Sequence, residues 1–170
     1  YFLWIKGIVT EGDFGKSMYT FRNVRKDVAE YLPATLELVI ISSLICAVLG
    51  LTLGVLAAGF KETFIDEGIR LLTYAGVSIP YFLWAIFLLL IFGYFTYIAP
   101  TGGRINPGIQ VPPVITGLIT IDGLITGNFQ ATLSALRHLL LPALSLSMGG
   151  IATTARITRN SMIDNERKDF

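Results

Sequence analysis

The chain has 170 residues, of which 53% are hydrophobic and only 15% are charged, and its mean hydropathy is +0.65. Soluble domains carry roughly 25% charged residues, so this composition indicates a membrane protein. A net charge of +1 gives no positive field for binding DNA or RNA, and one cysteine with one histidine excludes a disulfide scaffold and a structural zinc site.

The first predicted membrane-crossing element follows an external segment over 1–33. We expect a transmembrane helix over 34–60, because its charge-free part has 23 residues and would be about 34 Å long. About 20 apolar residues suffice to cross the hydrocarbon. Glu37 follows Pro33 closely, which predicts a place in the first turns of this helix, where the helix dipole favours negative charge.

One stripe of this helix carries a small residue at every fourth position, namely Ser42, Cys46, Gly50, Gly54 and Ala58. Small residues at this spacing let two helix backbones approach closely within a membrane. We therefore predict that Gly50, Gly54 and Ala58 lie at a helix contact, against the alternative that the stripe arises by chance.

The middle of the chain is predicted to be a link over 61–70, a second transmembrane helix over 71–99 and a loop over 100–138. Pro80 should kink the second helix, because proline lacks the backbone donor. Within the loop, the related segments 115–118 and 125–128 are compatible with a small β-hairpin. Asn128 is placed to cap a short helix that leads into the next span.

The third predicted transmembrane helix covers 139–155 and is short, with nine small residues among its 17. Such a helix should be surrounded by protein or should line a polar passage. The candidates for lining a passage are Ser145, Ser147, Gly149 and Thr153. Burial among helices is the alternative interpretation.

The distribution of basic residues does not orient these spans, because the two sides carry six and seven Lys and Arg residues. Counting only the short stretches beside the spans favours a cytoplasmic location for the link 61–70 and the tail 156–170.

The sequence offers no recognisable catalytic centre or cofactor site. A DFG triplet at 13–15 has no kinase catalytic loop or glycine-rich loop beside it, and no P-loop occurs. Intramembrane serine hydrolysis is disfavoured because the lone His138 lies at the end of a span beside Arg137. We therefore expect no catalytic residue, no cofactor and no metal.

Five segments together resemble the permease subunits of the dipeptide/oligopeptide class of ATP-binding-cassette importers. They are GDFGKS at 12–17, LPATLEL at 32–38, SIPYF at 78–82, RHLLLPA at 137–143 and RITRNSM at 156–162. Each motif is weak alone, but five in the family's order are specific. The resemblance covers the whole chain and corresponds to about the middle half of such a subunit.

The resemblance implies an all-α polytopic membrane protein that contributes spans two to four of a six-span type I importer permease in the inner (plasma) membrane. Both ends are expected to continue into a longer protein, with one span before Tyr1 and the EAA loop just after Phe170. The cytoplasmic segment 156–170 would lead into that loop, so Arg156, Arg159 and Arg167 would position the segment that the ATPase grips. The alternative is that these three are ordinary interfacial charges.

The partners implied by the resemblance are a second permease, two ATPase subunits, an extracytoplasmic solute-binding protein and the lipid bilayer. The function implied is ATP-driven import of peptides or similar small solutes by alternating access. A structural or assembly membrane protein without transport activity remains the alternative.

Overall fold

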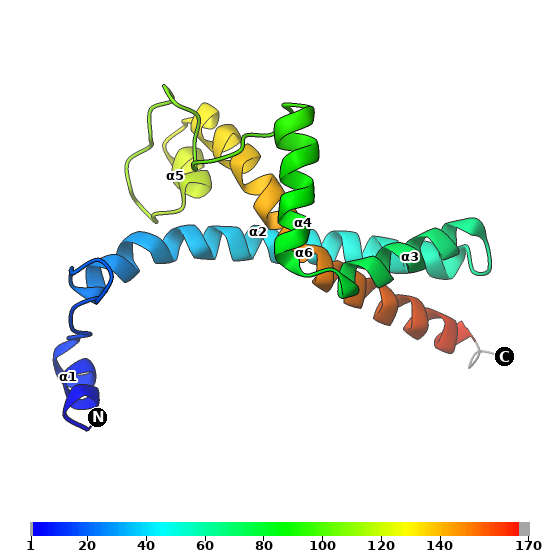
Figure 1. The fold of residues 1–170 in the computed structure, drawn as a ribbon, viewed down its shortest axis with the longest axis horizontal. Helices are drawn as coiled ribbons and strands as arrows, with labels where there is room; N and C mark the ends of the chain where they lie inside the picture. Colours follow the sequence, from blue (N-terminus) through cyan, green and yellow to red (C-terminus); the bar gives the residue numbers. More distant parts are fainter. Residues whose placement is uncertain (1, 167–170) are drawn as a thin grey trace.

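The computed structural model describes residues 2–166, and this part of the chain is helical without a β-strand. Its helices, shown in Figure 1, are α1 (Phe2–Glu11), α2 (Val24–Gly59), α3 (Phe64–Ser78), α4 (Tyr81–Leu88), the π-helix η1 (Leu89–Phe95), α5 (Ile119–Ile125) and α6 (Phe129–Glu166). Two of them, α2 and α6, are each long and apolar enough to cross a membrane. The prediction of an all-α membrane protein is confirmed.

Helix α2 begins ten residues earlier than the predicted start at residue 34. Asn23 supplies the N-cap, because its side chain accepts a hydrogen bond from the backbone N–H of Arg25 at 2.9 Å. Pro33 therefore lies inside the helix. The prediction that Glu37 occupies the first turns was wrong, because this residue lies more than three turns from the helix start.

The stretch 71–99 is not one kinked helix, as we predicted, but two helical segments that meet at 114°. Ile79 and Pro80 are both extended, since Pro80 cannot donate a backbone hydrogen bond and the residue before a proline avoids helical geometry. The helix before the break also starts earlier than expected, at Phe64. Asp66 and Glu67 lie in its first turn, where acidic residues favour a helix start, so most of the predicted link is helical.

The loop after η1 contains the short helix α5 where the sequence allowed a β-hairpin, so that interpretation was wrong. Asp122 in α5 fixes the conformation of the preceding loop residues. Its buried carboxylate accepts hydrogen bonds from the backbone N–H groups of Ile115, Thr116 and Gly117 at 3.2, 2.8 and 3.0 Å. Burial alone would raise the pKa of Asp122, but these bonds and one from the Thr116 hydroxyl hold the pKa below its ordinary value. The Asp122 carboxylate therefore holds 115–117 against α5, and the described residues have no strand ladder between 115–118 and 125–128.

Helix α6 is longer than the predicted span 139–155 at both ends and has 38 residues. It begins at Phe129, and the predicted cap at Asn128 is confirmed by a 3.1 Å hydrogen bond from the backbone N–H of Ala131 to the Asn128 side chain. The helix crosses α2 near its middle, and its first half lies beside α5 while its last half lies beside α3 (Figure 1).

The contact between α2 and α6 depends on glycines. A Cβ atom placed on Gly50 would lie 2.7 Å from the Cβ of Thr154, and one on Gly54 would lie 2.5 Å from the Cβ of Thr158. Such distances are too short for real side chains, so these backbones approach closely only because glycine stands there. Ala58, the third member of the predicted contact, is buried.

We expect Gly54→Ala to destabilise the folded protein by about 1 to 3 kcal/mol, because overpacking forces the two helices apart. Gly59→Ala is the matched control, since a Cβ at Gly59 in the same helix would meet nothing within 4 Å. Thermal unfolding of the purified full-length protein in detergent measures both. Equal midpoints for Gly54→Ala and Gly59→Ala would contradict the contact.

Candidate functional site

A hollow of about 430 Å³ lies between α2, α4 and α6 at the point where the helices cross. Its walls are mostly small, hydroxyl-bearing or apolar, and no lining residue carries a formal charge. The lining residues are Ser42, Ser43, Cys46, Ala47, Leu51, Tyr81, Leu146, Ser147, Gly150 and Thr154. We call this the central hollow.

The hydroxyl groups of the central hollow differ in how far they are engaged. Ser147 donates a 2.9 Å hydrogen bond to the carbonyl of Leu144 in its own helix, which satisfies a buried hydroxyl without a charged partner. Cys46 and Thr154 face each other across the two helices with 3.9 Å between sulfur and oxygen. The central hollow therefore has neutral, weakly polar walls.

A second hollow of about 290 Å³ lies between α4, α6 and the residues that follow η1, and it contains His138 and Ser145. The Nδ1 atom of the buried His138 lies 2.8 Å from the carbonyl oxygen of Ser134, one turn earlier in α6. Ser145 donates to the carbonyl of Pro142 at 2.9 Å. Within residues 2–166 no hydrogen bond joins His138 to a serine hydroxyl, so this pair has no nucleophile–base geometry.

The four residues predicted to line a passage do not share one surface. Ser147 lies in the central hollow, whereas Ser145 lies in the second hollow. Gly149 contacts α4, because a Cβ there would lie 2.9 Å from the Tyr81 hydroxyl oxygen. Thr153 is exposed and donates back to the carbonyl of Gly149 at 2.9 Å.

A buried carboxylate joins α2 to the long loop and α5. Glu37 is 2% exposed, and its Oε2 accepts a hydrogen bond from Nη2 of Arg104 at 2.9 Å. Its Oε1 accepts from both the backbone N–H and the hydroxyl of Thr120, each at 2.7 Å. We call Glu37, Arg104 and Thr120 the Glu37 cluster. The sequence showed an acid near a helix start, but partners 67 and 83 residues away left no signal in it.

A second buried carboxylate joins α3 to α6. Asp66 is 1% exposed and receives both Nε and Nη2 of Arg159 at 2.7 Å, a bidentate ion pair. It also accepts from the backbone N–H of Glu62 at 3.2 Å, and Nε of Arg70 lies 3.7 Å away. We call Asp66, Arg70 and Arg159 the Asp66 cluster. Asp66 was missed in the sequence, because an acid near a span does not reveal which arginine it meets.

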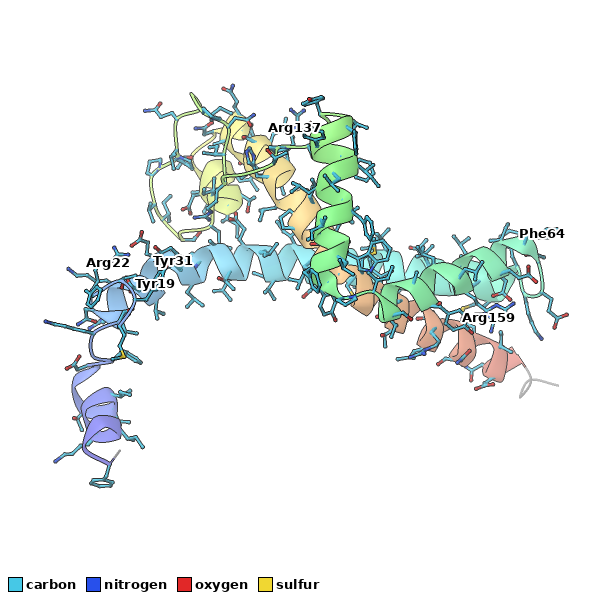
Figure 2. All side chains as sticks on the ribbon, viewed as in Figure 1. Tyr19, Arg22, Tyr31, Phe64, Arg137 and Arg159 are labelled. Atoms are coloured by element: carbon cyan, nitrogen blue, oxygen red, sulfur yellow. The ribbon has the colours of Figure 1, made fainter. Side chains whose placement is uncertain are left out.

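The basic residues singled out at the end of α6 have different environments. Arg159 is held by Asp66, whereas Arg156 is exposed and has no ion pair with any residue between 2 and 166. Arg167 lies outside the described residues. Among the described residues no group of three His, Cys, Asp or Glu side chains could hold a metal ion. Figure 2 places Arg137 and Arg159 toward opposite ends of α6.

Comparison with known proteins gives a consistent result. Residues 50–170 match the family described as the binding-protein-dependent transport system inner membrane component. The chain is 33% identical over 159 residues to a probable D,D-dipeptide transport system permease protein of Escherichia coli, covering 94% of this chain and 47% of that protein. It is 34% identical over 164 residues to a di/tripeptide transport system permease protein of Pseudomonas aeruginosa, covering 96% and 48%. A peptide transport system permease protein of Salmonella typhimurium is 32% identical over 164 residues, covering 95% and 50%.

The chain therefore spans about half the length of the curated relatives it matches. The three relatives are described as peptide transport permeases, and their descriptions mention no enzymatic reaction.

The Asp66–Arg159 pair gives a stability prediction. We expect Asp66→Asn to lower the free energy of unfolding by on the order of 3 kcal/mol, because removing one partner of a buried ion pair leaves the other charge uncompensated. Thermal unfolding and protease sensitivity of the full-length protein measure this.

Glu67→Gln is the control for the Asp66→Asn experiment, since Glu67 is the exposed next residue in the first turn of α3. We expect it to cost less than 1 kcal/mol, as for a charge near a helix terminus. If the two variants unfold at the same temperature, the ion pair does not stabilise the contact between α3 and α6.

Proposed function

This chain belongs to the family of binding-protein-dependent transport system inner membrane components, and on that premise we propose that the whole protein is the permease of an importer of peptides or similar small solutes. The family match and the apolar helices α2 and α6 place the chain in a membrane. The substrate class comes from the relatives, which are named as dipeptide, di/tripeptide and peptide permeases.

The observation that carries this proposal is the central hollow. It lies where α2, α4 and α6 meet, and its volume of about 430 Å³ falls within the range of small-molecule sites. Its neutral, hydroxyl-bearing walls suit a solute that must enter and leave, because a charged wall would bind a peptide terminus strongly. Ser147 and its neighbours in the central hollow are the residues that would line the path.

The partners would be a second permease, an extracytoplasmic solute-binding protein and two ATPase subunits that supply the energy. The family's own description as binding-protein-dependent supports the second of these. The ATPases would act at the end of α6, where the Asp66 cluster joins α3 to α6. Arg159 would then serve as a positioning residue, because its pairing with Asp66 makes the two helix ends move together.

The mechanism would be alternating access, in which helix ends shift as packed units and change the side to which the path opens. Two properties of the described residues support it. The α2–α6 contact is tight at Gly50 and Gly54, so these helices would move as one body. The 114° break at Ile79 and Pro80 lies beside Tyr81, a wall residue of the central hollow, and would be the hinge.

We further propose a cytoplasmic location for two segments. They are the predicted link 61–70, which contains the turn between α2 and α3, and the segment 156–170. The segment 1–33 and the residues 100–138 would then lie outside. The crossing elements would be 34–60, 71–99 and 139–155. The helices α2, α3 and α6 would extend beyond these crossings on either side of the membrane. The location would be the inner membrane, with several crossings.

The transport proposal is tested with vesicles that contain both permeases, the ATPases and the binding protein. Labelled dipeptide should accumulate only with ATP, and equal uptake without ATP would refute the proposal. Because Cys46 lines the central hollow, alkylation with N-ethylmaleimide should inhibit uptake severalfold, and Cys46→Ser should remove that sensitivity. Uptake that remains unchanged after Cys46 has been alkylated would show that the hollow is not part of the path.

The proposed orientation is tested by cysteine labelling of intact cells in the Cys46→Ser background. We expect a membrane-impermeant maleimide to label Lys16→Cys and to leave Lys61→Cys unlabelled until the cells are opened. Both side chains lie in non-helical segments and are at least partly accessible, so labelling reports the side of the membrane. The opposite labelling pattern would reverse the topology.

A further inference from the structure

Three arginines line one hollow at the end of α6. This hollow has a volume of about 200 Å³, lies between α2, α3 and α6, and includes Arg70 and Arg159 of the Asp66 cluster. Its walls are Ala57, Ile69, Arg70, Thr73, Tyr74, Ala155, Arg156, Arg159 and Asn160. We call it the arginine hollow.

The arginine hollow has more positive than negative charge. The lining includes three arginines and no acidic residue. Asp66 compensates Arg159 through two short hydrogen bonds and lies 3.7 Å from Arg70, and Glu62 also acts on Arg159. Arg156 has no ion pair within the described part of the chain. Tyr74 and Asn160 add residues with polar groups to the walls. An anion with several acceptor oxygens would match the guanidinium donors, and a phosphate is the best chemical match.

The position of the arginine hollow along the helices is that of a membrane surface. In α6 the charge-free stretch ends at Ala155, directly before Arg156. In α3 the charge-free stretch begins at Leu71, directly after Arg70. In α2 the charge-free stretch ends just past the hollow, at Phe60. Three helices thus change from apolar to charged at the same level, which is where lipid headgroups lie.

Apolar surface continues from the arginine hollow toward the membrane interior. A smaller hollow of about 80 Å³ shares Arg156, Thr73 and Tyr74 with it and adds Val77, Ser78 and Ala152. Tyr74 and Val77 are 60% and 55% exposed. Arg156 thus lies between the arginine hollow and an apolar surface. A residue in this position could bind a lipid headgroup while the acyl chains lie against the helix.

We propose that the arginine hollow binds the phosphodiester headgroup of an anionic phospholipid, with Arg156 as the principal contact. A volume of about 200 Å³ is below the range of drug-sized ligands, which disfavours a peptide or nucleotide in this hollow. Arg159 and Arg70 add to the positive electrostatic potential that attracts the phosphate. Placing this lipid in the cytoplasmic leaflet rests on the orientation proposed above. The preference for an anionic headgroup does not depend on that orientation.

The test measures lipid binding to the assembled importer, which contains the full-length permease. The complex is purified in a zwitterionic detergent, and binding of phosphatidylglycerol and of phosphatidylcholine is followed by native mass spectrometry without peptide or ATP. We expect Arg156→Gln to weaken phosphatidylglycerol binding about fivefold, the effect of one basic residue near an anionic surface. Arg156→Lys should retain most of the binding, which also shows that the site remains folded.

Lys61→Gln is the matched control, because it removes one positive charge at the same end of the helices but outside the arginine hollow. It should leave phosphatidylglycerol binding unchanged. Equal weakening by Lys61→Gln and Arg156→Gln would show a general surface attraction, and unchanged binding in Arg156→Gln would show that protein covers the hollow. Either result overturns the proposal.

A last arm separates the headgroup of a lipid from free phosphate. Inorganic phosphate at 10 mM, a concentration chosen as roughly physiological, should not displace phosphatidylglycerol, because the acyl chains add binding energy that phosphate lacks. Full displacement would assign the site to the free ion instead. Since no arm measures transport, failure here is distinguishable from failure of the proposed function.

Discussion

The close approach of α2 and α6 is the constraint on which the rest of the fold depends. In lipid, apolar side chains gain little by leaving the surrounding acyl chains, so helices associate by tight packing of small residues. Gly50 and Gly54 meet Thr154 and Thr158 with no room for a further carbon atom. This contact fixes where the helices cross, and the central hollow lies at that crossing, with Cys46 and Gly150 among its walls.

Two buried carboxylates complete the arrangement at either end of the crossed helices. Glu37 joins α2 to the long loop and α5, and Asp66 joins α3 to α6. Burying a carboxylate is costly, so such pairs often contribute little net stability, but they penalise arrangements in which the partner is absent. Their effect is to specify which segments lie together.

The distribution of charge divides the molecule into parts with different chemistry. The central hollow is neutral and bears hydroxyl groups, whereas the arginine hollow is positive and lies where the apolar surface ends. In the proposed permease, neutral walls would let a polar solute pass without being trapped, and a basic rim would fix the height of the protein in an anionic leaflet. The same helix, α6, supplies both regions through Ser147 and Arg156, which lie nine positions apart.

The sequence by itself determined the membrane character, the helical class, the family resemblance and the cap at Asn128, because hydropathy, capping chemistry and ordered motifs are local properties. It also indicated the small-residue stripe that includes Gly54. Only the tertiary structure decided the complete break at Pro80, the helix in place of a hairpin around Asp122, and the partners of Glu37 and Asp66. Arg104 lies 67 positions from Glu37 and Arg159 lies 93 positions from Asp66, and no periodicity in a single chain records such pairings. The partners of the Asp122 carboxylate are close in the chain, but their hydrogen bonds depend on which groups become buried together.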